Sequence, residues 1–191
     1  KHLKQQLRLA ICGTSRAGKD TFAEVLEDKL VEMGFAEADK LAFADPLKQL
    51  YKNYFFYKED KEKPRDAYVT IGNAMREVDE DVWINHLLIA ADESWVRGYS
   101  ILVTDVRYEN EAKVLMDKFG FILIKVDADG LIRKQRAESL GETLDLNNSG
   151  DAEVGFIKED LLVINNGEDD LKQMERYAEI AINMAQEVAN G

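Results

Sequence analysis

Short apolar runs alternate along the chain with longer stretches in which apolar residues recur every three to four positions. The runs have the length of strands buried in a parallel sheet, and they lie at 7–12, 40–44, 100–105, 121–126 and 161–165. The helical patterns lie at 19–33, 67–78, 81–96, 109–119, 131–139 and after 167. Strands that alternate with helices predict an α/β fold with a central parallel sheet covered on both faces.

Turn-forming residues separate these elements. Gly34 is expected to end the first helix. Asp45-Pro46 is expected to open another, with Asp45 as N-cap and proline at the first helical position. The charged run 58–65 has no apolar period and predicts a solvated loop. Gly141–Gly155 has few large apolar residues and is expected to be a mobile loop.

The chain of 191 residues has the length of one domain. We expect a core formed by 7–44, 100–126 and 160–191, with insertions at about 45–99 and 127–159.

Composition argues against several classes of function. The net charge of −12 disfavours sequence-independent binding of duplex nucleic acid, which needs a cationic surface. No window approaches the ~18 apolar residues of a membrane span. Cys12 is the only cysteine, and the two histidines have no zinc-type spacing. We therefore expect a protein of the reducing cytoplasm, a monomer or homodimer, whose partners are small molecules.

The segment Gly13-Thr14-Ser15-Arg16-Ala17-Gly18-Lys19 has the spacing of a phosphate-binding P-loop and lies between a strand and a helix. Its glycines let successive N–H groups turn toward phosphate oxygens, and the helix N-terminus adds partial positive charge. Lys19 then reaches the β- and γ-phosphates of a nucleoside triphosphate. The expected triphosphate contacts are Gly13, Ser15, Arg16, Ala17, Gly18, Lys19, Asp20 and Thr21.

Two carboxylates and a hydroxyl are candidate Mg²⁺ ligands. Asp20 stands where most P-loops have Ser or Thr, and Thr21 follows it. Asp20 either binds the metal or simply favours the first turn of the helix as a negative charge. Asp105 ends an apolar strand at the position of a Walker-B carboxylate, so we expect it to face the P-loop; a capping role is the alternative.

Phosphoryl transfer also needs cations that neutralise the donor, the acceptor and the moving group. The candidates are Arg16, Arg65, Arg76, Arg107, Arg133 and Arg136. They lie where the loops of a parallel sheet are expected to converge. Trp83, by contrast, fits the buried face of a helix better than a base-stacking position.

Several segments together resemble the bacteriophage-type deoxynucleoside monophosphate kinases. In chain order they are Gly18-Lys19-Asp20-Thr21, Phe43–Lys48, the series Arg65, Gly72, Arg76, Asp81 and Trp83, then Thr104–Glu111, and finally Asn165-Asn166-Gly167. The resemblance spans nearly the whole chain. It implies a P-loop kinase fold of three αβα layers with a helical acceptor-binding insertion and a lid. It also implies ATP and Mg²⁺ as cofactors, and transfer of the γ-phosphoryl group to a deoxynucleoside monophosphate.

The resemblance also implies roles for single residues. Lys19, Arg107 and Arg133 would be catalytic, and Arg133 and Arg136 would lie on the lid, with Arg133 also on ATP. Asn166 and Gly167 would lie near the adenine. The residues expected around the acceptor are Asp45, Arg65, Arg76, Trp83, Arg107 and Arg136. The chain departs from the family pattern at Thr104, where an acidic residue is expected, and in 147–153, which lacks a His/Ser–Glu pattern.

Two alternatives remain open. The chain could be a P-loop kinase of another small phosphorylated acceptor, similar to phosphomevalonate or dephospho-coenzyme A kinases. It could instead be a nucleotide-binding switch protein that has no acceptor. A switch protein has no reason to place Arg65 and Arg76 beside the donor phosphates, whereas a kinase needs an acceptor clamp there.

Overall fold

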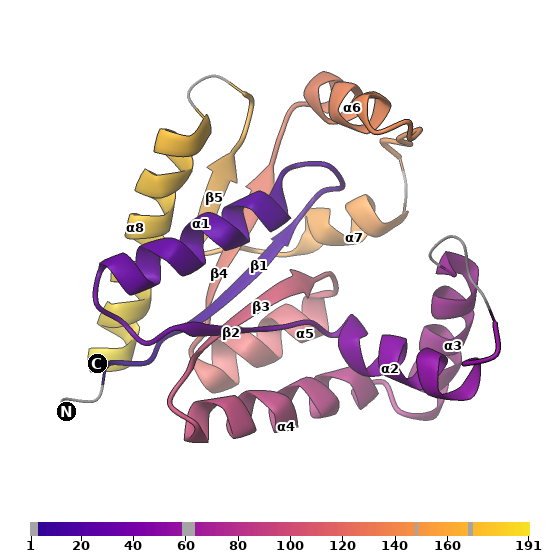
Figure 1. The fold of residues 1–191 in the computed structure, drawn as a ribbon, viewed down its shortest axis with the longest axis horizontal. Helices are drawn as coiled ribbons and strands as arrows, with labels where there is room; N and C mark the ends of the chain where they lie inside the picture. Colours follow the sequence, from indigo (N-terminus) through magenta and orange to yellow (C-terminus); the bar gives the residue numbers. More distant parts are fainter. Residues whose placement is uncertain (1–3, 59–63, 148, 168–169) are drawn as a thin grey trace.

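The computed structural model describes residues 4–58, 64–147, 149–167 and 170–191. Five parallel strands form one sheet in the order β2-β3-β1-β4-β5. The strands are β1 (Arg8–Gly13), β2 (Ala38–Leu41), β3 (Ser100–Val106), β4 (Ile122–Asp127) and β5 (Leu161–Ile164). Their carboxyl ends share one edge of the sheet, where parallel α/β proteins bind ligands (Figure 1).

Helices cover both faces of the sheet. They are α1 (Lys19–Glu32), α2 (Ala44–Tyr54), α3 (Arg65–Val78), α4 (Val82–Val96), α5 (Glu109–Lys113), α6 (Gly130–Ser139), α7 (Ser149–Phe156) and α8 (Asp170–Asn190), and a π-helical turn, η1 (Val114–Lys118), continues α5. Alternation along β1 divides the core in two. Leu9 and Ile11 pack with α1 and α8, whereas Ala10 and Cys12 pack with α4, α5 and α7.

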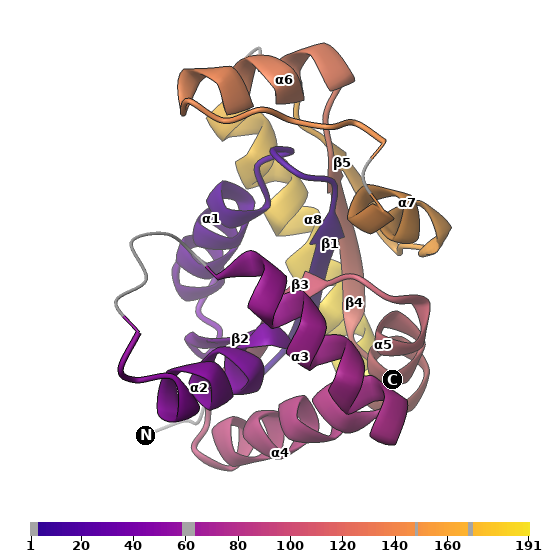
Figure 2. The ribbon, with the colours of Figure 1, turned by 90° about the vertical axis from the view of Figure 1, so that its right-hand side faces the viewer.

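Two groups of helices are inserted between strands of the sheet. Helices α2, α3 and α4 lie between β2 and β3 in the chain, and Figure 1 shows α2 and α3 beyond the carboxyl edge of β3. Helices α6 and α7 lie between β4 and β5, and Figure 2 shows α6 above the loop that joins β1 to α1. Within the described ranges, no helix has the length and apolar character needed to cross a membrane.

Most predicted elements are confirmed within one to three residues, including the end of α1 before Gly34, whose φ of 87° suits glycine. The start of α2 was predicted incorrectly. Helix α2 begins at Ala44, two residues earlier than predicted, and Asp45 is not its N-cap: the carboxylate of Asp45 accepts a hydrogen bond from Ala42 N, before the helix. In the charged run 58–65, residues 59–63 lie outside the described residues.

The expectation of a mobile loop at 141–155 was also wrong for its second half. Residues 149–156 form α7, although Gly150 and Gly155 are poor helix formers. Val154 and, just beyond the helix, Ile157 are 4% and 2% exposed and pack into the core beneath the sheet. Tertiary packing therefore overrides the low helix propensity of this segment.

Candidate phosphate-binding site

The P-loop joins the carboxyl end of β1 to the start of α1. Its backbone turns through positive φ at Arg16 (62°) and at Gly18 (96°), which directs amide groups toward one side of the loop. A side chain is excluded at both glycines: a Cβ on Gly13 would lie 2.1 Å from Val126 O, and one on Gly18 would lie 2.3 Å from Asn165 Nδ2. The motif glycines are thus required by the packing of β4 and β5 against the loop.

Lys19 lies at the first residue of α1 and lines the cavity in front of the loop. Its ammonium group donates a hydrogen bond to Thr14 O, a carbonyl of the loop, at 3.0 Å. Burial lowers the pKa of Lys19, and the neighbouring charge of Arg107 acts in the same direction, while Asp20 and Asp151 oppose them. A phosphate in this cavity would interact with the poorly hydrated ammonium group of Lys19.

Asp105, near the end of β3, lines the same cavity. Its two oxygens accept hydrogen bonds from Phe43 N at 2.7 Å and from Ala44 N at 3.0 Å. Burial raises the pKa of Asp105, although the two hydrogen bonds act to lower it. Asp105 therefore lines the P-loop cavity and also caps the start of α2, a role that we had expected Asp45 to perform, while its role as a Mg²⁺ ligand stays a prediction.

The carboxylate of Asp151, on α7, contacts the P-loop itself. Its Oδ1 accepts hydrogen bonds from Ser15 N at 2.8 Å and from Ser15 Oγ at 3.0 Å. Its Oδ2 forms an ion pair with Arg133 of α6, and the side chains of both partners are 9% exposed. Arg133 also donates to Ser15 O at 3.2 Å. Burial acts to raise the pKa of Asp151, but the bonds from Ser15 and Arg133 outweigh it and hold the pKa below its usual value.

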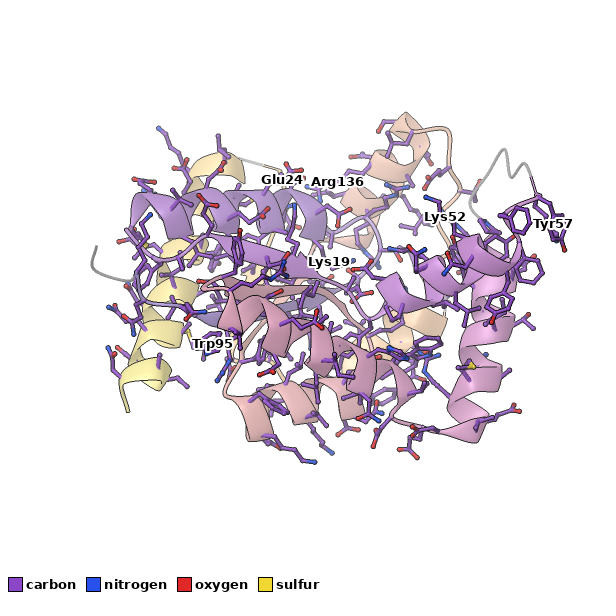
Figure 3. The ribbon with its side chains drawn as sticks, turned by 60° about the horizontal axis from the view of Figure 1, so that its bottom comes forward. Lys19, Glu24, Lys52, Tyr57, Trp95 and Arg136 are labelled. Atoms are coloured by element: carbon purple, nitrogen blue, oxygen red, sulfur yellow. The ribbon has the colours of Figure 1, made fainter. Side chains whose placement is uncertain are left out.

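Arg136, one turn after Arg133, joins the P-loop to the residues that follow β5. Its guanidinium donates to Arg16 O and Ala17 O at 3.3 Å, and to Asn165 O at 3.1 Å. Asn165 Nδ2 in turn donates to Ala17 O at 2.8 Å. Figure 3 shows Arg136 near the beginning of α1. The side chain of Arg136 is thus engaged with carbonyls of the loop, and the acceptor contact expected for it stays a prediction.

Arg107 follows the end of β3, is exposed and lines the same cavity as the P-loop. Glu111 Oε2 fixes the backbone there by accepting Arg107 N at 2.9 Å and Tyr108 N at 3.1 Å. Arg76, half-buried on α3, lies over the ring of Tyr108 at 4.7 Å. Arg76 therefore lies against the segment that carries Arg107, just beyond the end of β3.

Three further residues expected around the acceptor lie on α2, α3 and α4. Trp83 is 3% exposed and its indole N–H donates to Gly72 O at 3.3 Å, so it supports α3 from the core and offers little surface to a substrate. Arg65 is exposed at the first residue of α3. Asp45 is exposed and pairs with Lys48 at 3.3 Å.

The residues present fit a magnesium ion held mainly by phosphates. Enzymes that transfer phosphoryl groups hold Mg²⁺ through one or two carboxylates, with substrate oxygens and waters completing the shell. Asp105 faces the cavity, and Asp20 and Thr21 are exposed in the first turn of α1. Among the described residues no group of three acidic, histidine or cysteine side chains forms a metal site by itself. The two bonds that Asp105 already accepts favour contact through water.

The turn after β5 lies beside the P-loop. Asn166 Oδ1 accepts Asp129 N at 2.9 Å, and Gly167 has a φ of 96°. Asp127, at the end of β4, accepts Thr14 Oγ1 at 2.7 Å and so ties the loop to the strand next to β1. The expected adenine contacts, Asn166 and Gly167, therefore lie on the side of the loop that Arg136 covers.

The cavity among these residues measures about 60 Å³ and is lined by the P-loop, the end of β3 and α7. A wider surface hollow of about 190 Å³ lies near Lys4, Glu37 and Arg97. That hollow is beyond the amino ends of the strands, the edge at which parallel sheets do not bind ligands. The smaller cavity is the one that the P-loop residues Gly13, Ser15 and Lys19 line.

Sequence reasoning missed two carboxylates of this site. Glu111 belongs to a segment that we had recognised, but its burial beneath Arg107 is not visible in the local pattern. Asp151 lies in the segment that we had expected to be a mobile loop, 136 residues from Ser15. The acidic residue close to the start of a short helix is the single local signal for Asp151, and it is a common one.

No protein-family model matches the chain, and no curated protein matches its sequence. Among solved structures, Kti12 of Chaetomium thermophilum in complex with ADP-AlF3 is similar with a TM-score of 0.56 and 13% identity, over 93% of this chain and 98% of that one. An unliganded sugar kinase from Janibacter sp. HTCC2649 gives 0.53 and 12%, over 96% and 98%. At this identity the likeness concerns the fold alone. It confirms the predicted α/β class with a parallel sheet in the arrangement of P-loop kinases.

Proposed function

We propose that this protein transfers the γ-phosphoryl group of ATP to a small phosphorylated acceptor, a deoxynucleoside monophosphate. The observation that carries the proposal is the pairing, in one cavity, of the P-loop lysine Lys19 with Arg107 and Asp105 from the end of β3. A site that only binds a nucleotide needs the P-loop lysine. A site that moves a phosphoryl group also needs cations on the far side of the cavity.

The donor would bind along the P-loop. The loop amides and the start of α1 would hold its β- and γ-phosphates, with Lys19 between them. Gly18 and Asn165 fix the loop against β5, so the amides are oriented before the nucleotide arrives. Such preorganisation lowers the barrier because no donor has to turn toward the charge as it develops.

The acceptor would bind between α3 and the end of β3. Arg107 and Arg76 would hold its phosphate, since guanidinium groups bind phosphate oxygens through paired hydrogen bonds. Tyr108 supports Arg76 from below, and Glu111 holds the backbone of Arg107. An acceptor phosphate is already ionised at neutral pH, so the reaction requires charge neutralisation and alignment and no general base.

Mg²⁺ would supply charge neutralisation at the β- and γ-phosphates when it is bound. Asp105 would hold it through water, because both carboxylate oxygens keep the amides of Phe43 and Ala44. Asp20 and Thr21 would contribute from the first turn of α1.

A coupled ADP-release assay tests the proposal. The protein receives ATP, Mg²⁺ and, in turn, each deoxy- and ribonucleoside monophosphate, phosphomevalonate or dephospho-coenzyme A. We expect at least one deoxynucleoside monophosphate to raise turnover well above the ATP-only rate. If phosphomevalonate or dephospho-coenzyme A alone does so, the acceptor class is wrong. If ATP turnover is the same with every acceptor, the kinase assignment fails and a nucleotide-dependent switch takes its place.

Two variants separate the donor and acceptor sides. Lys19→Ala should abolish transfer, because the γ-phosphate loses its cation. Arg76→Ala should raise the KM of the acceptor by about tenfold to a hundredfold, the value of one charge-assisted hydrogen bond, with the KM of ATP unchanged. Arg176→Ala, which removes the same charge from an exposed position on α8, is the control. An unchanged acceptor KM in Arg76→Ala would remove Arg76 from the acceptor site.

A further inference from the structure

The P-loop presents its anion-binding groups to a carboxylate of the chain itself. Ser15 N and Ser15 Oγ both donate to Asp151 Oδ1, and Arg133 pairs with Asp151 Oδ2. A backbone amide of a P-loop, a hydroxyl and a guanidinium form the donor set that proteins use for phosphate. A carboxylate satisfies the same donors because it also offers two anionic oxygens in a plane.

We propose that Ser15 and Arg133 form an anion subsite for a terminal phosphate of the donor, and that Asp151 occupies this subsite in the free protein. The inference rests on the proposed use of the P-loop for a nucleoside triphosphate. Binding of the triphosphate then exchanges one anion for another: Asp151 leaves Ser15 and Arg133, and α7 moves away from the loop with it.

The small size of the cavity favours this movement. The space between the P-loop and α7 measures about 60 Å³, and Gly150, Asp151 and Val154 of α7 form one of its walls. Sites for small molecules have volumes of roughly 300–1,000 Å³. A triphosphate would compete with Asp151 for this small space, and displacement of α7 would remove both the wall and the competing charge.

Arg133 gives an independent reason to expect a larger anion here. Its side chain is buried, and Arg133 Nε has no hydrogen-bond partner among the described residues. Buried polar groups without partners are rare in native proteins, because they lose water without compensation. A phosphate has three terminal oxygens where a carboxylate has two, so it can satisfy more of the guanidinium fork than Asp151 does.

Helix α7 has few features that hold it in place against the P-loop. It has eight residues, two of them glycine, and a helix of this length is marginally stable without tertiary contacts. Its buried apolar contact is Val154, with Ile157 immediately after it. The ion pair of Asp151 is thus a large share of what holds the start of α7 on the P-loop.

Binding of inorganic triphosphate and of ATP, without acceptor and measured by calorimetry, tests the inference in Asp151→Asn. The asparagine keeps the shape and an oxygen for Ser15 but has no charge for Arg133. If the subsite is free in about a tenth of the wild-type molecules, its apparent affinity is reduced about tenfold. We therefore expect both probes to bind about tenfold more tightly to Asp151→Asn. Glu153→Gln, an exposed site on the same helix, removes the same charge and should bind as the wild type does.

Amide hydrogen exchange in the wild-type protein provides a second measurement that does not depend on a variant. Saturating ATP should accelerate exchange of the α7 amides while it protects the P-loop. Slower exchange in α7 on ATP binding would overturn the inference, since it would mean that Asp151 closes on the nucleotide.

The calorimetric outcomes are equally decisive. Equal or weaker binding of both probes by Asp151→Asn shows that Asp151 does not compete with phosphate. Failure of both proteins to bind either probe shows that Ser15 and Arg133 form no phosphate subsite. Tighter binding by Asp151→Asn, together with ATP turnover that no acceptor stimulates, supports the role of Asp151 and rejects the proposed kinase activity.

Discussion

Glu111 should make the stability of this protein depend on pH near neutrality. Its side chain is buried, with the residue 3% exposed, and it accepts the backbone amides of Arg107 and Tyr108. Burial raises the pKa of Glu111 from 4.5 to about 7, and the charge of Asp105 adds to the rise, while the two amides and Arg76 oppose it. The perturbation is Glu111→Gln, which keeps an oxygen for both amides and cannot ionise.

The magnitude follows from linkage. The folded-state pKa lies above the unfolded value, so the contribution of Glu111 is fully present below pH 4.5 and is lost as the pH rises through about 7. At 1.36 kcal/mol per pKa unit, the difference between the unfolded and folded pKa values of Glu111 corresponds to about 3 kcal/mol. The free energy of unfolding of the wild type, minus that of Glu111→Gln, should therefore fall by about 3 kcal/mol between pH 4.5 and 8.

Urea denaturation at several pH values, for both proteins under identical buffers, measures this difference. The subtraction cancels the titrating groups that do not interact with Glu111. Glu109→Gln is the matched control, because it removes a carboxylate from the same helix at an exposed ion pair with Lys113. Such pairs contribute about 0–1 kcal/mol, and we expect no trend of this size from it. A wild-type minus Glu111→Gln difference that stays constant across the range would refute the reasoning.

Two further predictions concern the frame of the site. Asp105→Ala should lower the free energy of unfolding by about 1–3 kcal/mol for each buried amide left without an acceptor at the start of α2, as urea denaturation would show; unchanged stability would mean that water replaces the carboxylate. Gly13→Ala should prevent ATP binding, measured by calorimetry, because the new Cβ would lie 2.1 Å from Val126 O and the loop must move. Normal ATP affinity in Gly13→Ala would show that the loop geometry is not needed.

Local pattern was sufficient for most elements and for the position of Lys19 at the start of α1. Apolar runs predict the five strands because a strand buried on both faces needs apolar residues throughout. The P-loop spacing predicts the position of Lys19 because the turn from β1 into α1 is a local structure. The same reasoning failed at Asp45, since a cap predicted from a dipeptide cannot include a carboxylate that arrives from another strand.

The sequence by itself therefore determined that β1 ends in a loop with P-loop spacing, with Lys19 at the start of a helix. Only the tertiary structure decided which carboxylates reach that loop and its surroundings. Asp105 is 62 residues from Phe43, and Asp151 is 136 residues from Ser15. Such pairs form because parallel strands bring their carboxyl ends to one edge of the sheet, and because α7 is held there by Val154. These contacts cannot be predicted from spacing along the chain. They determine where α2 begins, and they place the carboxylate of Asp151 at the P-loop.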